Sequence, residues 1–274
     1  MSELQIQKRS QIESLGYCSL AAALMVIFMQ TIGLWRWLTE ELGKTGAMVV
    51  PFVVAVVVFG VALAIRLYTG RSLRPRWSYL IVAAVVSTIA LYIPDPQFPA
   101  KRIHVAEFLL LAFLIRRGFC RWTDGIPLIT LTAICGIVLG AHDELLQGLH
   151  PDRRFGHTDI VVDGLASIAG ALAGHGLKLY DNIPRRKVDW ISPPLWALVL
   201  VAAGFIAFLY PLPAFQELPL PLWTLVPLSI TALMWYVLDR TSRLIGDPAS
   251  IIVWLVFLMI SYPILTHVTS AVFQ

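Results

Sequence analysis

The chain has 274 residues, of which 58% are hydrophobic and only 14% are charged, and its mean hydropathy is +0.75. This composition excludes a soluble globular protein and predicts a polytopic membrane protein. The net charge is +4 and the pI is near 9.1. The basic residues are scattered among short loops, a distribution that carries information on membrane topology and excludes a nucleic-acid-binding surface.

Apolar runs of the length needed to cross about 30 Å of hydrocarbon recur along the whole chain. Because backbone groups exposed to lipid must be hydrogen-bonded within their own segment, each run is expected to be a helix. We predict an all-α, polytopic transmembrane helical bundle of about nine spans. The count is uncertain by about one, because the fourth run begins with polar residues and the last two are rich in Pro, Ser and Thr. The predicted spans are 16–35, 46–65, 77–93, 99–115, 126–146, 158–179, 194–212, 220–238 and 251–273.

The predicted spans group into three regions of three. Residues 1–93 form an N-terminal region, residues 94–180 a polar core, and residues 181–274 a C-terminal extension. The first segment of the chain is polar and no small-residue cleavage site follows it, so we expect the first span to be an uncleaved anchor. The cysteines show no CxxC or other paired spacing, so neither a disulfide framework nor a zinc site is predicted.

Lysine and arginine are concentrated in every second loop. The loops richest in these cations are 66–76, 116–125, 178–189 and 239–247. The positive-inside rule then predicts a cytoplasmic N-terminus and, with nine spans, a C-terminus outside. The loop 148–157 lies on the opposite side in this topology, although it contains Arg153 and Arg154.

Polar residues gather on the fourth, fifth and sixth predicted helices. Residues three or four positions apart share a helix face, so each of these helices presents one polar face. The pairs are His104 with Glu107, Glu144 with Gln147, and Asp159 with Asp163. A charge at the centre of a bilayer costs about 2.5–3.5 kcal/mol on insertion scales, so pairing or function must offset the cost. The predicted topology brings all three pairs to the outer side of the membrane.

The segment between the fifth and sixth helices contains two helix breakers, Pro151 and Gly156. Its loop is able to fold back and aim Arg153 into the space between the two helices. Residues 157–159 (His-Thr-Asp) suit a helix start, with an acid near the positive end of the dipole. Small residues at four-residue spacing predict close helix packing in the same region. These are Gly136 and Gly140 in the fifth helix and Ala166, Gly170 and Gly174 in the sixth.

The polar residues form motifs in a fixed order. They are Lys101-x-x-His104-x-x-Glu107-Phe108, Asp143-Glu144-x-x-Gln147, Pro151-x-Arg153, and Asp159. This pattern, over about residues 94–174, resembles the VanZ-like membrane protein family, which is named for a protein linked to teicoplanin resistance. The chain departs from the family pattern at Asp163, where the family has Asn, and at Ala166, where it has Gly; Gly170 fits the next family glycine. The extra acid makes the site more negative. The resemblance implies the bacterial cell envelope and a multi-pass protein of the inner membrane, but no particular reaction.

We interpret the polar cluster as an outward-facing site that binds an anionic lipid-linked precursor or phospholipid headgroup. Whether the site also modifies this ligand is left open. Arg153 and Lys101 are expected to hold the anionic group. The other predicted substrate-binding residues are Gln147, Glu107 and Asp163, and the candidate catalytic residues are Glu144, His104 and Asp159. Glu144 is a general base or hydrogen-bond acceptor in this interpretation, and His104 is a base oriented by Glu107. The expected partners are membrane lipids, and no cofactor or resident metal is expected.

Three other interpretations remain open. Glu144, Arg153 and Asp159 form a buried salt-bridge network in a purely structural or assembly protein. Alternatively, Glu144, Asp159 and Asp163 couple protons to transport by a transporter or flippase. In the third, His104 and Glu107 are half of a divalent-metal site, although no motif such as HExxH fixes its geometry. His142, Asp143 or Asp159 would complete that site. Without a metal, Asp143 is a solvated neighbour of Glu144, and His142, His150 and His157 are interfacial or loop residues.

Overall fold

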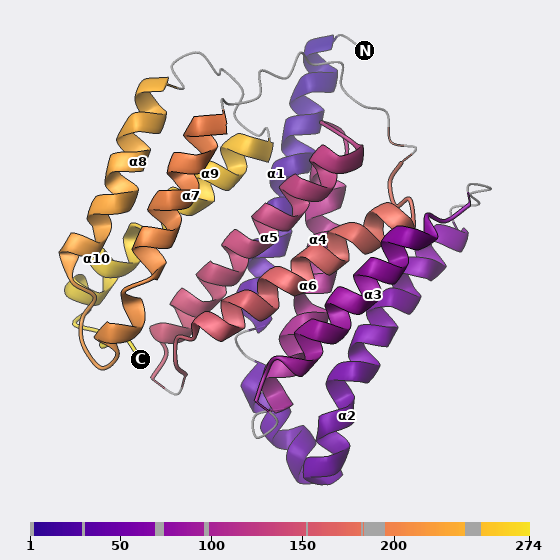
Figure 1. Cartoon of the computed structure of the whole chain (residues 1–274), viewed down its shortest axis with the longest axis horizontal. Coiled ribbons are helices and arrows are strands. Elements are labelled where there is room, and N and C mark those ends of the chain that lie inside the picture. The colour runs from indigo at the N-terminus through magenta and orange to yellow at the C-terminus, as the bar shows by residue number, and fades with distance from the viewer. Residues whose placement is uncertain are drawn as a thin grey trace. The chain divides into compact units, whose positions relative to one another are not determined.

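The computed structural model describes residues 3–28, 31–68, 74–95, 99–151, 153–181, 183, 195–238 and 248–274 (Figure 1). Within these residues the chain is helical and contains no β-strand. The all-α prediction is therefore confirmed. Packing divides the chain into two compact units, the first formed by Met1–Gly140 with His157–Arg186 and the second by Ala141–Gly156 with Lys187–Gln274. The three-region division proposed from the sequence stays a prediction.

Within the described residues, the first unit contains six helices and the beginning of a long one. Its α-helices are α1 (Glu3–Phe28), α2 (Thr31–Tyr68), α3 (Trp77–Tyr92), α4 (Ile103–Phe119) and α6 (His157–Gly176), with the 3-10 helix η1 (Pro99–Arg102) before α4. Helix α5 (Gly125–Gly148) belongs to this unit as far as Gly140.

The second unit contains the end of α5 and the C-terminal helices. These are α7 (Leu195–Leu209), η2 (Leu212–Phe215), η3 (Leu222–Thr224), α8 (Leu225–Leu238), α9 (Pro248–Leu258) and α10 (Ser261–Val268). The segment after α10 pairs with the end of α5 and the loop that follows it: the backbone N–H of Gln274 donates to the Gly148 carbonyl at 2.7 Å, and that of Phe155 donates to the Gln274 carbonyl at 2.9 Å. The Phe273 ring lies against Gly148, where any larger residue would collide with it.

Helices α4 and α6 form the interior of the first unit. α4 packs against α6, α1 and α2, while α6 packs against α3, which lies beside it in Figure 1. Most residues of α4 and α6 are buried, including Glu107, Arg116, Asp159 and Asp163. The covering helices instead expose large apolar side chains, such as Val56 on α2 and Ile81 on α3. Many large apolar side chains exposed on the outer helices are typical of a protein that contacts lipid.

Four segments of the described chain are long and apolar enough to cross a membrane. They are Gln11–Phe28, Thr45–Tyr68, Gly125–Gly148 and Pro248–Val268. Helix α4 is absent from this group because its 17 residues are too few, and α6 is absent because its polar residues lower its hydropathy. Both are buried among the apolar helices. The fold is thus compatible with a membrane protein.

Glycines allow the helices of the first unit to approach closely, as their spacing predicted. A Cβ at Gly170 would lie 2.6 Å from Ala112 Cβ on α4. A Cβ at Gly140 would lie 2.7 Å from Asp163 Cβ on α6, and one at Gly136 would collide with Ser167. Each of these positions therefore excludes a larger side chain, since packed interiors leave no such space.

Several predicted boundaries are wrong. The first predicted span, 16–35, joined parts of two helices, because α1 ends at Phe28. α2 is kinked at Gly43, whose φ of 67° lies in the left-handed region that glycine adopts readily. The last predicted span, 251–273, contains a break after Leu258, where Pro263 lacks the N–H that a continuous helix would need, although Pro248–Val268 as a whole is long and apolar enough to cross a membrane. Arg116 was placed in a loop but lies within α4.

Candidate functional site

The first pair of the predicted site joins η1 to the start of α6. Lys101 Nζ lies 2.5 Å from Asp159 Oδ2. The Asp159 side chain is 5% exposed, whereas that of Lys101 is 42% exposed. Asp159 lies in the first turn of α6, as the sequence predicted, where the helix dipole stabilises a negative charge. Lys101 is therefore an accessible cation held over a buried carboxylate.

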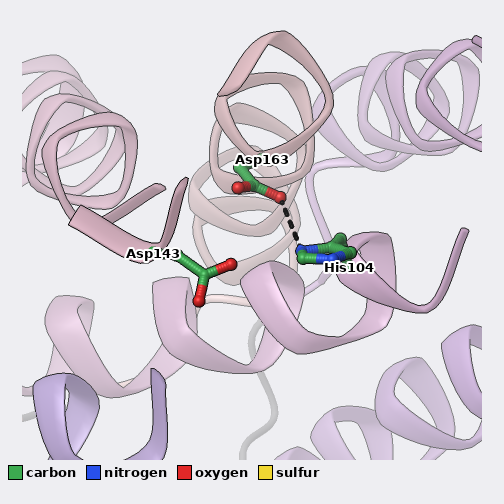
Figure 2. Close-up of side chains that lie close together, drawn as sticks. All are labelled: His104, Asp143 and Asp163. Carbon is green, nitrogen blue, oxygen red and sulfur yellow. Dashed lines mark ion pairs between the residues drawn. The ribbon is translucent and has the colours of Figure 1, made fainter. Parts of the chain in front are cut away.

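The second pair lies one helical turn further into the unit, between α4 and α6. His104 Nδ1 is 3.3 Å from Asp163 Oδ1, and Figure 2 shows the carboxylate directed at the imidazole ring. Glu107 Oε2 lies 3.9 Å from the same nitrogen. All three side chains are buried, and Asp163 is fully enclosed. An imidazole in contact with carboxylates in a closed space can hold a proton between them.

Three more predicted residues belong to the second unit. Gln147 Nε2 donates to Asp143 Oδ2 at 2.7 Å, one turn apart on α5. Glu144 is fully buried, and its Oε2 accepts the backbone N–H of Gly156 at 2.8 Å. This contact ties the loop after α5 back to the helix. The interpretation of Asp143 as a solvated residue is wrong, because it is 2% exposed. Asp143 is also drawn in Figure 2.

Arg153 lies in the same loop, half-buried, and its backbone N–H donates to the His150 carbonyl at 3.1 Å. Its Nε is buried and has no hydrogen-bond partner among the residues that the structure describes. Asp159 pairs with Lys101 within the first unit, and the salt-bridge network of Glu144, Arg153 and Asp159 stays a prediction.

His142 is placed differently from the prediction. It lies buried on α5 instead of at an interface or in a loop. Its Nδ1 is 3.0 Å from Tyr262 Oη and its Nε2 is 2.8 Å from the Leu255 carbonyl. Both ring nitrogens are engaged within the second unit, so His142 is not available to complete a metal site.

The structure thus places the predicted residues in two groups. Lys101, His104, Glu107, Asp159 and Asp163 come together in the first unit through η1, α4 and α6. Asp143, Glu144, Gln147 and Arg153 lie in the second unit, on the end of α5 and in the loop that follows. Gly140 was predicted only as a packing residue, yet it is the residue of α5 that lies against Asp163. Its four-residue spacing from Gly136 was the signal for this role.

Comparisons with family models, curated proteins and solved structures found no match to this chain. The resemblance to VanZ-like proteins stays a prediction based on the motifs themselves.

Proposed function

We propose that this chain is an integral membrane protein of the bacterial cell envelope, similar to VanZ-like proteins, that binds an anionic lipid headgroup. In this proposal the chain crosses the inner membrane about nine times, with its N-terminus in the cytoplasm and its C-terminus outside. Lys101 is the first contact of the headgroup, on the extracytoplasmic side. The ligand is a phospholipid or a lipid-linked envelope precursor, and no reaction is assigned.

The observation that carries the proposal is the unequal exposure of the Lys101–Asp159 pair. Lys101 keeps 42% of its side chain exposed while its ammonium contacts a buried acid. A partly exposed ion pair contributes little to stability, so an accessible ammonium at this place is better suited to binding than to holding the fold. A phosphate or carboxylate of a headgroup can approach Lys101 from outside and share or replace its bond to Asp159.

A second cation supports the same site. Arg102 follows Lys101 in η1 and is half-buried. Its Nε is buried and has no hydrogen-bond partner among the described residues. Two adjacent cations at the start of α4 suit an anion, which is also favoured near helix N-termini.

The experiment is native mass spectrometry of the detergent-purified chain with phosphatidylglycerol, together with its melting temperature. We expect Lys101→Ala to reduce lipid binding at least tenfold with little change in melting temperature. Lys101→Arg, which keeps the charge, should retain most of the binding. Arg154→Ala is the matched control, because Arg154 is an exposed cation elsewhere in the predicted outer part. Equal binding by wild type and Lys101→Ala would contradict the proposal.

A proton-coupled transporter or flippase is the second candidate, and the buried His104–Asp163 pair favours it. A fully enclosed carboxylate next to an imidazole is a group that can bind and release a proton as a transporter changes conformation. Uptake of a fluorescent headgroup analogue into proteoliposomes, driven by a pH gradient, would distinguish this candidate. Transport that persists in Asp163→Asn would exclude Asp163 from proton coupling.

A further inference from the structure

Arginines from three other segments of the first unit surround the carboxyl-terminal end of α6. Arg66 Nη1, from α2, donates to the Leu177 carbonyl at 2.8 Å. Arg116 Nε, from α4, donates to the Leu179 carbonyl at 3.2 Å. The last carbonyls of a helix lack partners within the helix, and its dipole favours cations at this end. Both carbonyls belong to the turn that follows α6, so these two bonds hold that turn against α2 and α4.

The bond to Leu179 does not use all the donors of Arg116. Its side chain is 1% exposed, and Nη2 lies 3.4 Å from Asp181 Oδ1. Its Nη1 is buried and has no hydrogen-bond partner among the described residues. A buried donor without a partner is costly, and more so when it is charged. The cost is consistent with a ligand that supplies the missing acceptor.

Arg76 adds a third guanidinium group, and its backbone N–H donates to the Gly176 carbonyl at the end of α6 at 2.9 Å. Its Nη1 donates to His175 Nε2 at 2.6 Å. His175 is buried in the last turn of α6, with the Tyr79 ring packed edge-on at a centroid distance of 4.5 Å. Arg76 itself is exposed, so an ion can reach it from outside the unit. An imidazole that accepts this bond is neutral, so it leaves the charge of Arg76 uncompensated.

The surroundings are therefore rich in positive charge. Arg66, Arg76 and Arg116 gather at one helix end, and Asp181 is the carboxylate that the structure records in an ion pair with them. The planar fork of a guanidinium group matches the spacing of phosphate oxygens. The fork of Arg76, the remaining donor Nη1 of Arg116 and a histidine at one place are suited to a phosphate group.

We propose that Arg76, Arg116 and His175 form a binding site for a phosphate-bearing anion, distinct from the Lys101 site. The two sites lie at opposite ends of α6, whose 20 residues extend about 30 Å. The fork of Arg76 binds two phosphate oxygens, and Arg116 Nη1 donates to a third. The phosphate belongs to an anionic phospholipid headgroup or is free in solution. In the predicted topology the site lies on the cytoplasmic side, where basic pockets between helices bind anionic lipids.

Arg76 provides the most direct test, because its side chain bonds to His175 and its loss should leave α6 intact. Arg74 is the matched control: it is an exposed arginine two positions earlier in the same segment. The full-length chain in neutral detergent is titrated with phosphatidylglycerol by native mass spectrometry and with inorganic phosphate by calorimetry. Phosphatidylcholine, which carries phosphate without a net negative charge, serves as the lipid reference.

We expect Arg76→Ala to weaken binding at least tenfold and Arg74→Ala to leave the Kd unchanged. Selective loss with phosphatidylglycerol supports a lipid headgroup, and selective loss with inorganic phosphate supports a soluble anion. The proposal is overturned if neither probe binds wild type, or if the two arginine variants bind equally well. Lys101→Ala should not change the Kd of the binding that Arg76→Ala weakens. The experiment therefore distinguishes a wrong proposal for the Lys101 site from a wrong proposal for the Arg76 site.

Discussion

His104 on α4 and Asp163 on α6 form an ion pair in the interior of the first unit, with Nδ1 and Oδ1 3.3 Å apart. Neither side chain has substantial access to solvent, and Asp163 has none. The pair joins the two helices that the other helices of the unit cover. It therefore links the packing of the unit to the chemistry of the candidate site.

This contact predicts a measurable coupling between the two residues. His104→Ala leaves the buried Asp163 carboxylate without one of its partners, so it should lower the free energy of unfolding. Asp163→Asn removes the charge with little change of shape and should relieve part of that loss. A double-mutant cycle is expected to give a coupling of about 0.5–3 kcal/mol. Unfolding in mixed detergent micelles measures it.

Thr88 provides the control for this cycle. It is exposed on α3 and bonds only to the carbonyl one turn earlier in its own helix. His104→Ala combined with Thr88→Ala should be additive within about 0.5 kcal/mol. Equal coupling in the two cycles would show that the His104–Asp163 contact has no specific energetic role.

Gly140 predicts a steric effect on the same site. In Gly140→Ala the new Cβ would lie 2.7 Å from Asp163 Cβ, so α5 or α6 must shift. Overpacking of this kind costs about 1–3 kcal/mol, and the melting temperature should fall accordingly. Gly60→Ala on α2 is the control, because its new Cβ would have no atom within 4 Å and alanine favours a helix. A Gly140→Ala protein as stable as Gly60→Ala would argue against the close approach.

The predicted topology can be tested with two single cysteines. Arg74 and Arg154 are both exposed and lie in loops predicted on opposite sides of the membrane. In intact spheroplasts, a membrane-impermeant maleimide should label Arg154→Cys. The same reagent should label Arg74→Cys only after the membrane has been permeabilised. The reverse pattern would invert the orientation, and labelling of both from outside would change the number of spans between them.

Cys120 predicts a pH-dependent reactivity. It lies at the end of α4, outside the predicted spans, and burial raises the pKa of its thiol, an effect that the nearby Arg117 and Arg116 oppose. The thiolate is the reactive form, so a raised pKa reduces the reactive fraction at neutral pH. Alkylation of Cys120 should therefore be slower than alkylation of Arg74→Cys. Its rate should also begin to rise at a higher pH than the alkylation rate of a free thiol does. Peptide mass spectrometry separates Cys120 from the other cysteines, and equal rates would contradict the burial.

The sequence by itself determined the helical class and the local arrangement of the polar residues. Apolar runs separated by basic loops predicted the helices, and the bounds of α3 and α5 agree with the prediction to within two residues. The start of α6 was predicted from residues 157–159, because an acid in the first turn complements the helix dipole. The glycine spacing also predicted close packing, which Gly170 and Gly140 confirm. These features depend on neighbours three or four positions away along the chain.

Only the tertiary structure decided which polar residues meet. Lys101 forms an ion pair with Asp159, and Arg76 donates a hydrogen bond to His175, although both pairs are far apart in the sequence. Such contacts depend on how α3, α4 and α6 cross, and this is determined by the packing of all their buried side chains together. The break in the last predicted span could not be predicted from the sequence either. A proline near the start of a helix and one inside a helix have the same local sequence pattern. Periodicity specifies the face of a helix, and only packing specifies the residue that this face meets.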